Sequence, residues 1–175
     1  NAIGVEPSKN VSDIAKSKGI NSINKFFDKD IIKSIKQHKY NTDIICAANV
    51  ICHVPNLVEL IQTIDLLLSK NGKFIFEEPY MGSMFKKTSY DQIYDEHIYM
   101  FSCNSVKKIF KLFDLHLTNA IPQITHGGSM RYVISRNKSN NKNLNKILDY
   151  EKKMNLDNLQ SCMEFKKNCE ISKIK

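Results

Sequence analysis

The sequence predicts an α/β fold, in which a mostly parallel β-sheet with helices on both faces ends in an antiparallel hairpin and is followed by a helical segment. Strand-like and helix-like stretches alternate in the amino-terminal half of the chain. The stretch at residues 43–48 is apolar throughout, as expected for a strand that is covered on both faces. Two later strand-like stretches are separated by little more than His126-Gly127-Gly128, which favours an antiparallel pair.

The first 78 residues are predicted to form successive βα units. The expected strands are residues 2–5, the segment INKFF that ends at Phe27, residues 43–48 and residues 73–78. The expected helices begin at Pro7 and Ser8, after a cap at Asp28, and at Asn56. The last of these helices is expected to continue to Lys70 and to be closed by Asn71-Gly72.

The second half of the chain begins with a long irregular stretch that includes YDQIYDEHIYMFS, residues 90–102. This stretch fits neither the helical nor the strand period, and long irregular segments in compact domains are often functional. The later elements are a helix at residues 104–114 and two strands at residues 115–124 and 129–135. After the polar linker NKSNNKN, two further helices are expected, at residues 144–154 and from residue 156 onward.

Composition excludes several classes of protein. A hydrophobic share of 42% and a charged share of 25% are ordinary for a globular protein, and no apolar run is long enough to span a bilayer. The net charge of +8 comes almost entirely from dispersed lysines, because Arg131 and Arg136 are the only arginines. Nucleic-acid readers usually recruit arginine, so neither a nucleic-acid nor a membrane partner is expected.

The five cysteines contain no C-x-x-C pair, which argues against a disulfide framework and against a metal site in this segment. A reducing, cytoplasmic location fits this pattern best. The chain starts without methionine, within an apolar strand, and stops without a helix-ending signal. These ends predict a fragment of a longer protein.

Ligands of parallel sheets bind beyond the carboxyl ends of the strands. The residues expected at these ends are Glu6, Phe27, Ala48, Asn49 and Glu78. Glu6 fits two interpretations equally well: a ligand of the ribose hydroxyls of a nucleoside, or an acid that favours the dipole of the following helix. Of the neighbouring acids Glu77 and Glu78, which point to opposite faces, Glu78 is nearer the strand end and is expected in the cleft.

The irregular stretch over the same edge contains Tyr90, Tyr94, Glu96 and His97. A histidine beside an acid is a plausible general base near neutral pH, and tyrosine hydroxyls can donate to a developing oxyanion. On composition alone, a polar surface loop with partly buried tyrosines is the stronger interpretation. His53, which opens a helix, is more often a structural hydrogen-bonding residue.

Four motifs together resemble the sugar C-methyltransferases, S-adenosylmethionine-dependent enzymes of deoxysugar biosynthesis. These motifs are NVICHV, FIFEEPY, YDQIYDEHIYMFS and ITHGGSMRYVISR, and the resemblance covers most of residues 1–136. It implies a partial Rossmann-like class I methyltransferase domain at residues 1–136 that lacks its first strand and glycine-rich loop. It also implies that residues 137–175 are a linker and the beginning of a carboxyl-terminal C-methyltransferase domain, and that zinc binds only in a missing amino-terminal module.

The resemblance also implies the roles of individual residues. His97 would remove the proton alpha to the ketone of a nucleotide-linked sugar, with Glu96 and Tyr94 as its active-site neighbours. Glu6 would bind the ribose of S-adenosylmethionine. Further cofactor contacts are expected at the strand ends, from Phe27, Ala48 and Asn49.

Three other functions stay open on the sequence. A nicotinamide-dependent oxidoreductase would share the strand-end acid but would carry a G-x-G-x-x-G turn upstream. A class I methyltransferase that acts on oxygen or nitrogen is the second alternative, although the usual Pro-Pro-Tyr type motif of amino-methyltransferases is replaced here by AANVICHV. The third is a non-catalytic basic binding module, whose binding to random DNA would weaken steeply with salt.

Overall fold

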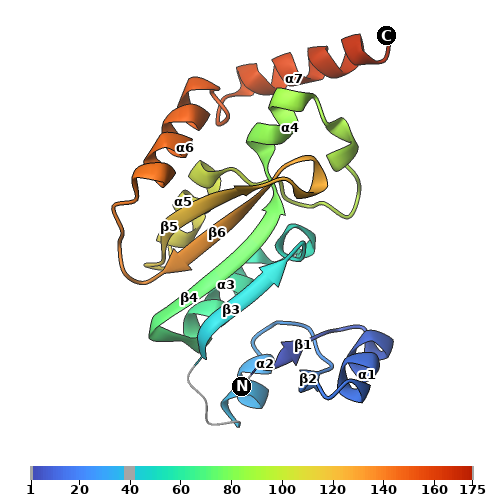
Figure 1. Ribbon diagram of the computed structural model, residues 1–175, viewed down its shortest axis with the longest axis vertical. Helices are drawn as coiled ribbons and strands as arrows, with labels where there is room; N and C mark the ends of the chain where they lie inside the picture. The colour runs from blue at the N-terminus through green and yellow to red at the C-terminus, as the bar shows by residue number, and fades with distance from the viewer. Residues whose placement is uncertain (1, 38–41, 175) are drawn as a thin grey trace.

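The computed structural model describes residues 2–37 and 42–174, and these residues form an α/β fold with two β-sheets (Figure 1). The strands β1 (Gly4–Val5) and β2 (Ser22–Ile23) form a short parallel pair. A second sheet has the order β3-β4-β6-β5 and consists of Thr42–Ala48, Leu68–Pro79, Ser129–Ser135 and His116–Gln123. The α/β class and the antiparallel hairpin are therefore confirmed.

The larger sheet is mixed. Strand β3 pairs in parallel with β4, whereas β6 runs antiparallel to both β4 and β5. Among the described residues, β1 and β2 pair only with each other, and β3 pairs only with β4. The expected continuous sheet is thus two separate sheets. In the described part of the chain, β1 and β3 each have one unpaired edge.

The amino-terminal unit differs in detail from the prediction. Strand β2 ends at Ile23, so Phe27 lies beyond the strand and not at its end. Asn24 follows β2, and its side-chain amide donates to the carbonyl oxygens of Glu6 and Pro7, which replaces strand pairing with a polar turn. Helix α1 spans Lys9–Ser17 and α2 spans Ile31–Lys36, with Asp30 and not Asp28 at the amino-terminal cap position of α2.

Helix α3 (Leu57–Leu67) ends earlier than predicted, because the chain passes directly into β4 at Leu68. Asn56 caps the helix by accepting a hydrogen bond from the backbone N–H of Glu59. Gly72 does not close the helix but lies within β4, where a Cβ would be 2.8 Å from a Leu68 side-chain carbon and 3.0 Å from the Thr42 carbonyl oxygen. This glycine therefore permits the close approach of β3 and β4.

The long stretch after β4 is only partly irregular. Helix α4 (Met81–Lys87) was not predicted, and it ends where Thr88 adopts a left-handed conformation with φ of 56°. A single 3-10 turn, η2 (Tyr90–Gln92), follows, and the chain then has no regular structure up to the start of α5 (Cys103–Lys111). The prediction of an irregular YDEH segment is thus confirmed for most of its length.

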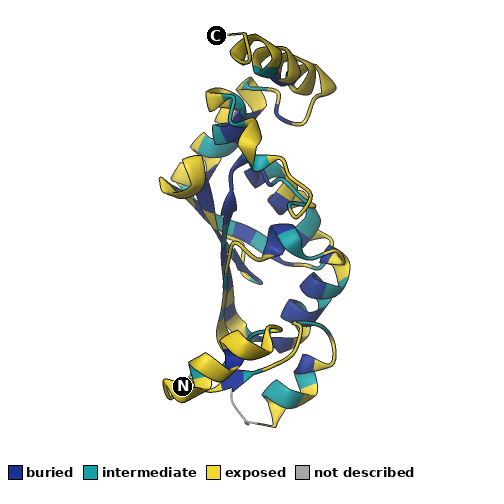
Figure 2. Ribbon diagram, turned by 90° about the vertical axis from the view of Figure 1, so that its right-hand side faces the viewer, coloured by how far each residue is buried: buried dark blue, intermediate teal, exposed yellow. Residues whose placement is uncertain are grey.

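Helices α3 and α5 cover one face of the larger sheet and lie behind it in Figure 1. The buried core follows this interface (Figure 2), and Phe76 of β4 stacks on Tyr132 of β6 with ring centroids 4.8 Å apart. The opposite face is more open: Ile44 of β3 is 61% exposed, and Cys46 is also exposed.

The carboxyl-terminal helices are α6 (Lys142–Lys153) and α7 (Leu159–Ser172). Helix α6 packs against α5 and β5, and its Leu144 belongs to the core of the larger sheet. Phe165 of α7 stacks on Phe85 of α4 with centroids 4.7 Å apart. No helix in the described ranges is long and apolar enough to cross a membrane.

Candidate active site

The candidate base, His97, is held by two hydrogen bonds within its own loop. Its Nδ1 lies 2.8 Å from the backbone carbonyl oxygen of Gln92. A carbonyl oxygen can only accept a hydrogen bond, so Nδ1 carries the proton in the neutral ring. The lone pair is therefore on Nε2, which lies 2.8 Å from the hydroxyl of Tyr94 and accepts a hydrogen bond from it.

The same loop is docked on the 3-10 turn η1 (Ile51–His53), which follows β3. The carbonyl oxygen of Cys52 accepts hydrogen bonds from the backbone N–H groups of Ile98 and Tyr99, at 2.9 and 3.3 Å. His53 Nδ1 donates to the carbonyl oxygen of Glu96 at 2.8 Å, and the His53 and His97 rings are 5.0 Å apart. The expected structural role of His53 fits this contact.

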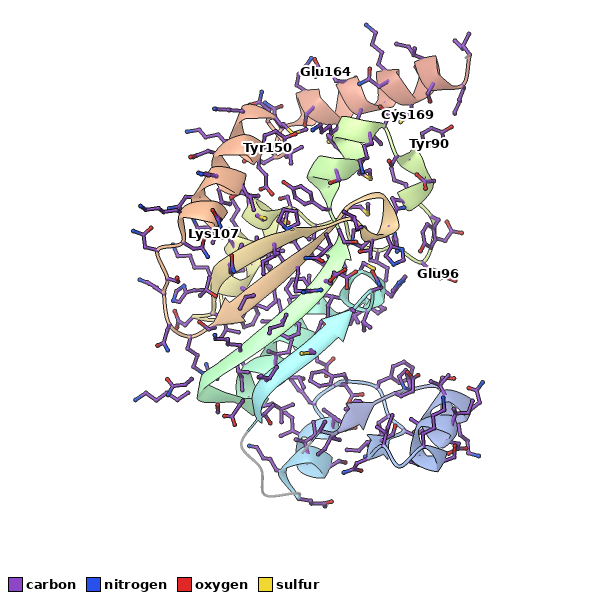
Figure 3. All side chains as sticks on the ribbon, viewed as in Figure 1. Tyr90, Glu96, Lys107, Tyr150, Glu164 and Cys169 are labelled. Carbon is purple, nitrogen blue, oxygen red and sulfur yellow. The ribbon has the colours of Figure 1, made fainter. Side chains whose placement is uncertain are left out.

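Glu96 contributes its backbone to this arrangement. Its side chain is exposed, and Figure 3 shows it projecting from the outer side of the loop, as does the side chain of Tyr90. Tyr94 is 47% exposed although its ring lies 4.1 Å from that of His97. The structure thus brings Tyr94 and His97 into direct contact and leaves the Glu96 carboxylate facing solvent.

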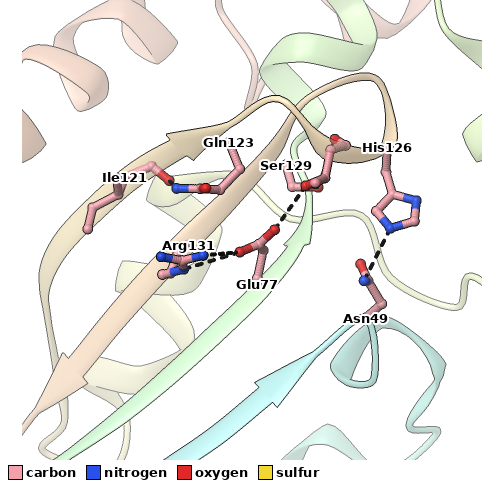
Figure 4. A network of polar contacts seen from close by, with 8 residues as sticks. Asn49, Glu77, Ile121, Gln123, His126, Ser129 and Arg131 are labelled. Carbon is pink, nitrogen blue, oxygen red and sulfur yellow. Dashed lines mark hydrogen bonds and ion pairs between the residues drawn. The ribbon is translucent and has the colours of Figure 1, made fainter.

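A pocket of about 250 Å³ lies on the open face of the sheet, beside the carboxyl end of β3. Its lining residues come from β3, β4 and β6, and they are Cys46, Ala47, Ala48, Ile75, Phe76, Glu77 and Arg131. Ala48 lines this pocket, and its contact with a cofactor stays a prediction. Asn49 follows directly with φ of 52°, and its side-chain nitrogen lies 3.3 Å from His126 Nε2 (Figure 4).

The acid in this pocket is Glu77 and not Glu78, which corrects the sequence prediction. Glu77 accepts two hydrogen bonds from the Arg131 guanidinium, at 3.1 and 2.9 Å, and one from the Thr125 hydroxyl at 2.9 Å (Figure 4). Glu78 points to the opposite face of the sheet and is completely buried. The sequence prediction chose the residue nearer the strand end. Both acids lie within β4, which continues to Pro79, and because side chains alternate along a strand, Glu77 is on the open face when Glu78 is on the buried one.

Glu6 and Phe27 lie in the amino-terminal unit and are not in the pocket lining. The Glu6 carboxylate accepts a hydrogen bond from the backbone N–H of Ser8 at 2.7 Å, just before α1. This contact matches the structural interpretation of Glu6 as an acid at the start of a helix. Phe27 packs against the core of the larger sheet. Their predicted cofactor contacts stay predictions.

Three side chains near the base have metal-binding atoms close together. Cys52, His53 and His97 each offer one donor atom, and these atoms lie within 4.8 Å of one another. Burial, and after it the neighbouring Glu78, raise the pKa of the Cys52 thiol far above its usual range. Because the thiolate is the metal ligand, a thiol held in its neutral form disfavours metal binding there.

Two carboxylates are buried, and neither their burial nor their hydrogen-bond partners were predicted from the sequence. Glu78 accepts hydrogen bonds from the backbone N–H groups of Val50 and Ile51, at 3.0 and 2.6 Å. Glu151 of α6, which is 2% exposed, accepts from the Tyr80 hydroxyl and from the first N–H groups of α5. No local pattern indicates this role for Glu151, because its partners are 47 to 71 residues away in the chain.

The α/β sheet with a pocket beside a strand end defines a Rossmann-like fold of the kind that binds nucleoside cofactors. The chain belongs to the methyltransferase domain family, whose model matches residues 1–120. It is similar to the C-methyltransferase NovU of Streptomyces niveus, with 26% identity over 128 residues. The matched region is 73% of this chain and 30% of that relative, so the chain spans less than a third of it.

Solved structures show the same fold at low identity. A possible histamine N-methyltransferase from Thermotoga maritima has a TM-score of 0.57 and 15% identity, over 77% of this chain and 72% of that one. A magnesium protoporphyrin IX methyltransferase from Synechocystis, solved with bound SAH, has a TM-score of 0.55 and 13% identity, over 77% and 64%. The fold is therefore that of the class I S-adenosylmethionine-dependent methyltransferases.

Proposed function

We propose that this chain is part of an S-adenosylmethionine-dependent C-methyltransferase that methylates the carbon alpha to the ketone of a nucleotide-linked deoxysugar. The observation that carries the proposal is the state of His97. Its Nδ1 donates to a backbone carbonyl, so in the neutral ring Nε2 carries the lone pair, on a loop above the sheet. Carbon methylation needs such a base, because a C–H bond must be broken before the new C–C bond forms.

The chemistry begins when Nε2 of His97 takes the alpha proton. The electron pair of the C–H bond becomes the C=C bond of an enolate, and the negative charge moves to the former ketone oxygen. In the described structure the Tyr94 hydroxyl donates to Nε2, so the substrate would displace it from the nitrogen that acts as base. The displaced hydroxyl would then be free to donate to the enolate oxygen.

S-adenosylmethionine would supply the electrophilic methyl group that the enolate carbon accepts. The pocket fits the edge of such a cofactor, because the small side chains of Cys46 and Ala48 leave its floor open beside the strand end. Asn49, with its left-handed backbone, turns the chain away from the pocket at this point. Glu6 is proposed to bind the ribose, which requires its carboxylate to exchange the Ser8 N–H for two hydroxyl groups.

The nucleotide-linked deoxysugar is proposed from the motif resemblance, and the similarity to the C-methyltransferase NovU supports carbon as the methyl acceptor. We also propose that sequence outside this chain supplies the first strand of the sheet, the glycine-rich loop and a zinc module. The unpaired edges of β1 and β3 and the small share of NovU that is matched support this extension. The segment alone is then expected to bind S-adenosylmethionine weakly, and tight one-to-one binding in calorimetry would contradict the proposed layout.

The test of the base uses the intact enzyme, a keto-sugar nucleotide and S-adenosylhomocysteine in deuterated water. Wild type should exchange the alpha proton for deuterium, and His97→Asn should lower the exchange rate by roughly two or more orders of magnitude. His116→Asn, a histidine of β5 outside the loop, is the matched control and should exchange like wild type. Undiminished exchange in His97→Asn would remove this residue from the base role.

A further inference from the structure

Glu78 occupies an unusual place beneath the candidate site. Its side chain lies on the face of β4 that the helices cover, and it is completely buried, with 0% exposure. One oxygen, Oε1, accepts both backbone N–H groups at the start of η1. The other oxygen, Oε2, is buried without a hydrogen-bond partner among the described residues, and the Cys52 thiol is the neighbouring group with a proton to share. Burying a carboxylate with one unpaired oxygen is costly, so an explanation beyond packing is needed.

The turn that Glu78 holds is the platform for the base loop. Val50 and Ile51 are bonded to the carboxylate, and the next residue, Cys52, uses its carbonyl oxygen to accept the N–H groups of Ile98 and Tyr99. His53, at the end of the same turn, bonds to the Glu96 carbonyl oxygen. One buried charge thus fixes the short turn onto which the backbone on both sides of His97 is docked.

The same turn also fixes the end of β3. Asn49 directly precedes Val50, and its own N–H donates to the carbonyl oxygen of Glu77 at 2.9 Å. Because Asn49 has φ of 52°, the chain leaves the strand in a conformation that is rare for a side chain other than glycine. Two charge-assisted hydrogen bonds, one and two residues later, hold this conformation in place.

We propose that Glu78 is a positioning residue that couples the two halves of the site: the strand end at Ala48 and Asn49, and the loop that carries His97. It does not touch the reacting atoms. Its carboxylate fixes η1, and η1 fixes the distance between the pocket and the basic Nε2. The catalytic consequence rests on the proposed function, whereas the structural coupling does not, and the two are measured separately.

The coupling is tested by site-resolved hydrogen exchange on the intact enzyme. Glu78→Gln keeps the shape of the side chain but replaces charge-assisted hydrogen bonds with neutral ones, which are about half as strong. The N–H groups of Ile98 and Tyr99 should then exchange roughly tenfold faster, since local opening becomes easier. Amides at the far end of the β5–β6 pair, around Leu117 and Ile134, should keep their wild-type protection, because Glu78 faces β6 at Met130, near the opposite end of that strand.

The matched control is Tyr132→Phe. The Tyr132 hydroxyl is likewise buried without a partner on the same side of the sheet, but it is not bonded to η1. Its removal should leave the exchange of Ile98 and Tyr99 unchanged. If Glu78→Gln does not fold, Glu78→Asp keeps the charge, shortens the reach by one methylene and is expected to show the same loop-specific loosening.

The catalytic part uses the alpha-proton exchange assay on the same variants. Glu78→Gln should lower the rate of exchange at saturating substrate, and Tyr132→Phe should not. Equal acceleration of all amides, unchanged exchange at Ile98 and Tyr99, or failure of both Glu78 variants to fold would overturn the positioning role. If wild type itself exchanges no alpha proton while the loop amides respond as expected, the proposed function fails and the coupling through Glu78 stands.

Discussion

The buried carboxylate of Glu151 offers the sharpest test of how the carboxyl-terminal segment is attached. It accepts hydrogen bonds from the N–H groups of Cys103 and Asn104, at 2.6 and 2.8 Å, and from the Tyr80 hydroxyl at 3.0 Å. The two N–H groups begin α5, where the helix dipole favours a negative charge. A residue of α6, beyond the predicted domain boundary at residue 136, therefore completes the amino-terminal cap of a core helix.

Glu151→Ala leaves three donors without their acceptor. A buried donor that loses its partner costs about 1–3 kcal/mol. Water can enter the space left by the side chain and recover part of this cost, so the lower end of the range applies to each donor. We expect a loss of about 3–5 kcal/mol, similar to the range observed when one partner of a buried charged pair is removed.

Urea unfolding of the intact enzyme, followed by far-ultraviolet circular dichroism, measures this loss as a lower midpoint at constant slope. Glu164→Ala is the matched control, because Glu164 is an exposed glutamate of the neighbouring helix α7 (Figure 3), and its free energy should change by at most about 0.5 kcal/mol. Glu151→Gln keeps one acceptor oxygen and should fall between the two. Equal midpoints for Glu151→Ala and Glu164→Ala would refute the reasoning.

Three further outcomes are expected. Burial raises the pKa of four core groups, Cys52, Tyr80, Cys103 and Tyr132. The stability that these neutral groups contribute is complete below the unfolded pKa values, about 8.5 for cysteine and 10 for tyrosine, and it is lost as the pH rises above them. A melting temperature that stays flat up to pH 10.5 would contradict this account. Glu6→Ala should weaken cofactor binding in calorimetry with little effect on turnover at saturation, and unchanged affinity would leave Glu6 a structural acid. Gly128→Ala should destabilise the protein more than Gly127→Ala. Both glycines have positive φ, but only a Cβ at Gly128 would lie within 2.6 Å of the Ser83 side chain, and equal urea midpoints for the two variants would exclude that clash.

Much of the fold was predictable because it depends on local signals. The apolar run of β3, the capped start of α3 and the glycine turn between β5 and β6 each specify their element within a few residues. The errors arise where long-range packing decides. Gly72 was interpreted as a helix end, whereas it allows the close approach of β3 and β4, a role that depends on a carbonyl oxygen 30 residues away at Thr42.

The candidate site shows the same division. The density of tyrosines and acids around His97 identified the loop, and alternation correctly separated Glu77 from Glu78. Which of the two acids faces the pocket depends on which face of the sheet the helices cover, and that is decided by packing between residues far apart in the chain. Glu151 shows the limit most clearly, because a buried carboxylate on an amphipathic helix looks in sequence like any exposed acid on its polar face.

The loop that carries His97 has almost no regular structure, and its geometry must therefore come from elsewhere. Hydrogen bonds from the backbone N–H groups of Ile98 and Tyr99 to the Cys52 carbonyl oxygen, and from the His53 ring to the Glu96 carbonyl oxygen, supply it. These contacts involve main-chain atoms on the loop side, so they place the loop without specifying its side chains. The identity of the base is set separately, by the Gln92 carbonyl oxygen that holds the proton on Nδ1 of His97. A substitution in the loop that preserves its backbone path should thus leave the tautomer of His97 intact, whereas loosening η1 beneath it would shift the position of His97 and leave its bond to Gln92 within the loop in place.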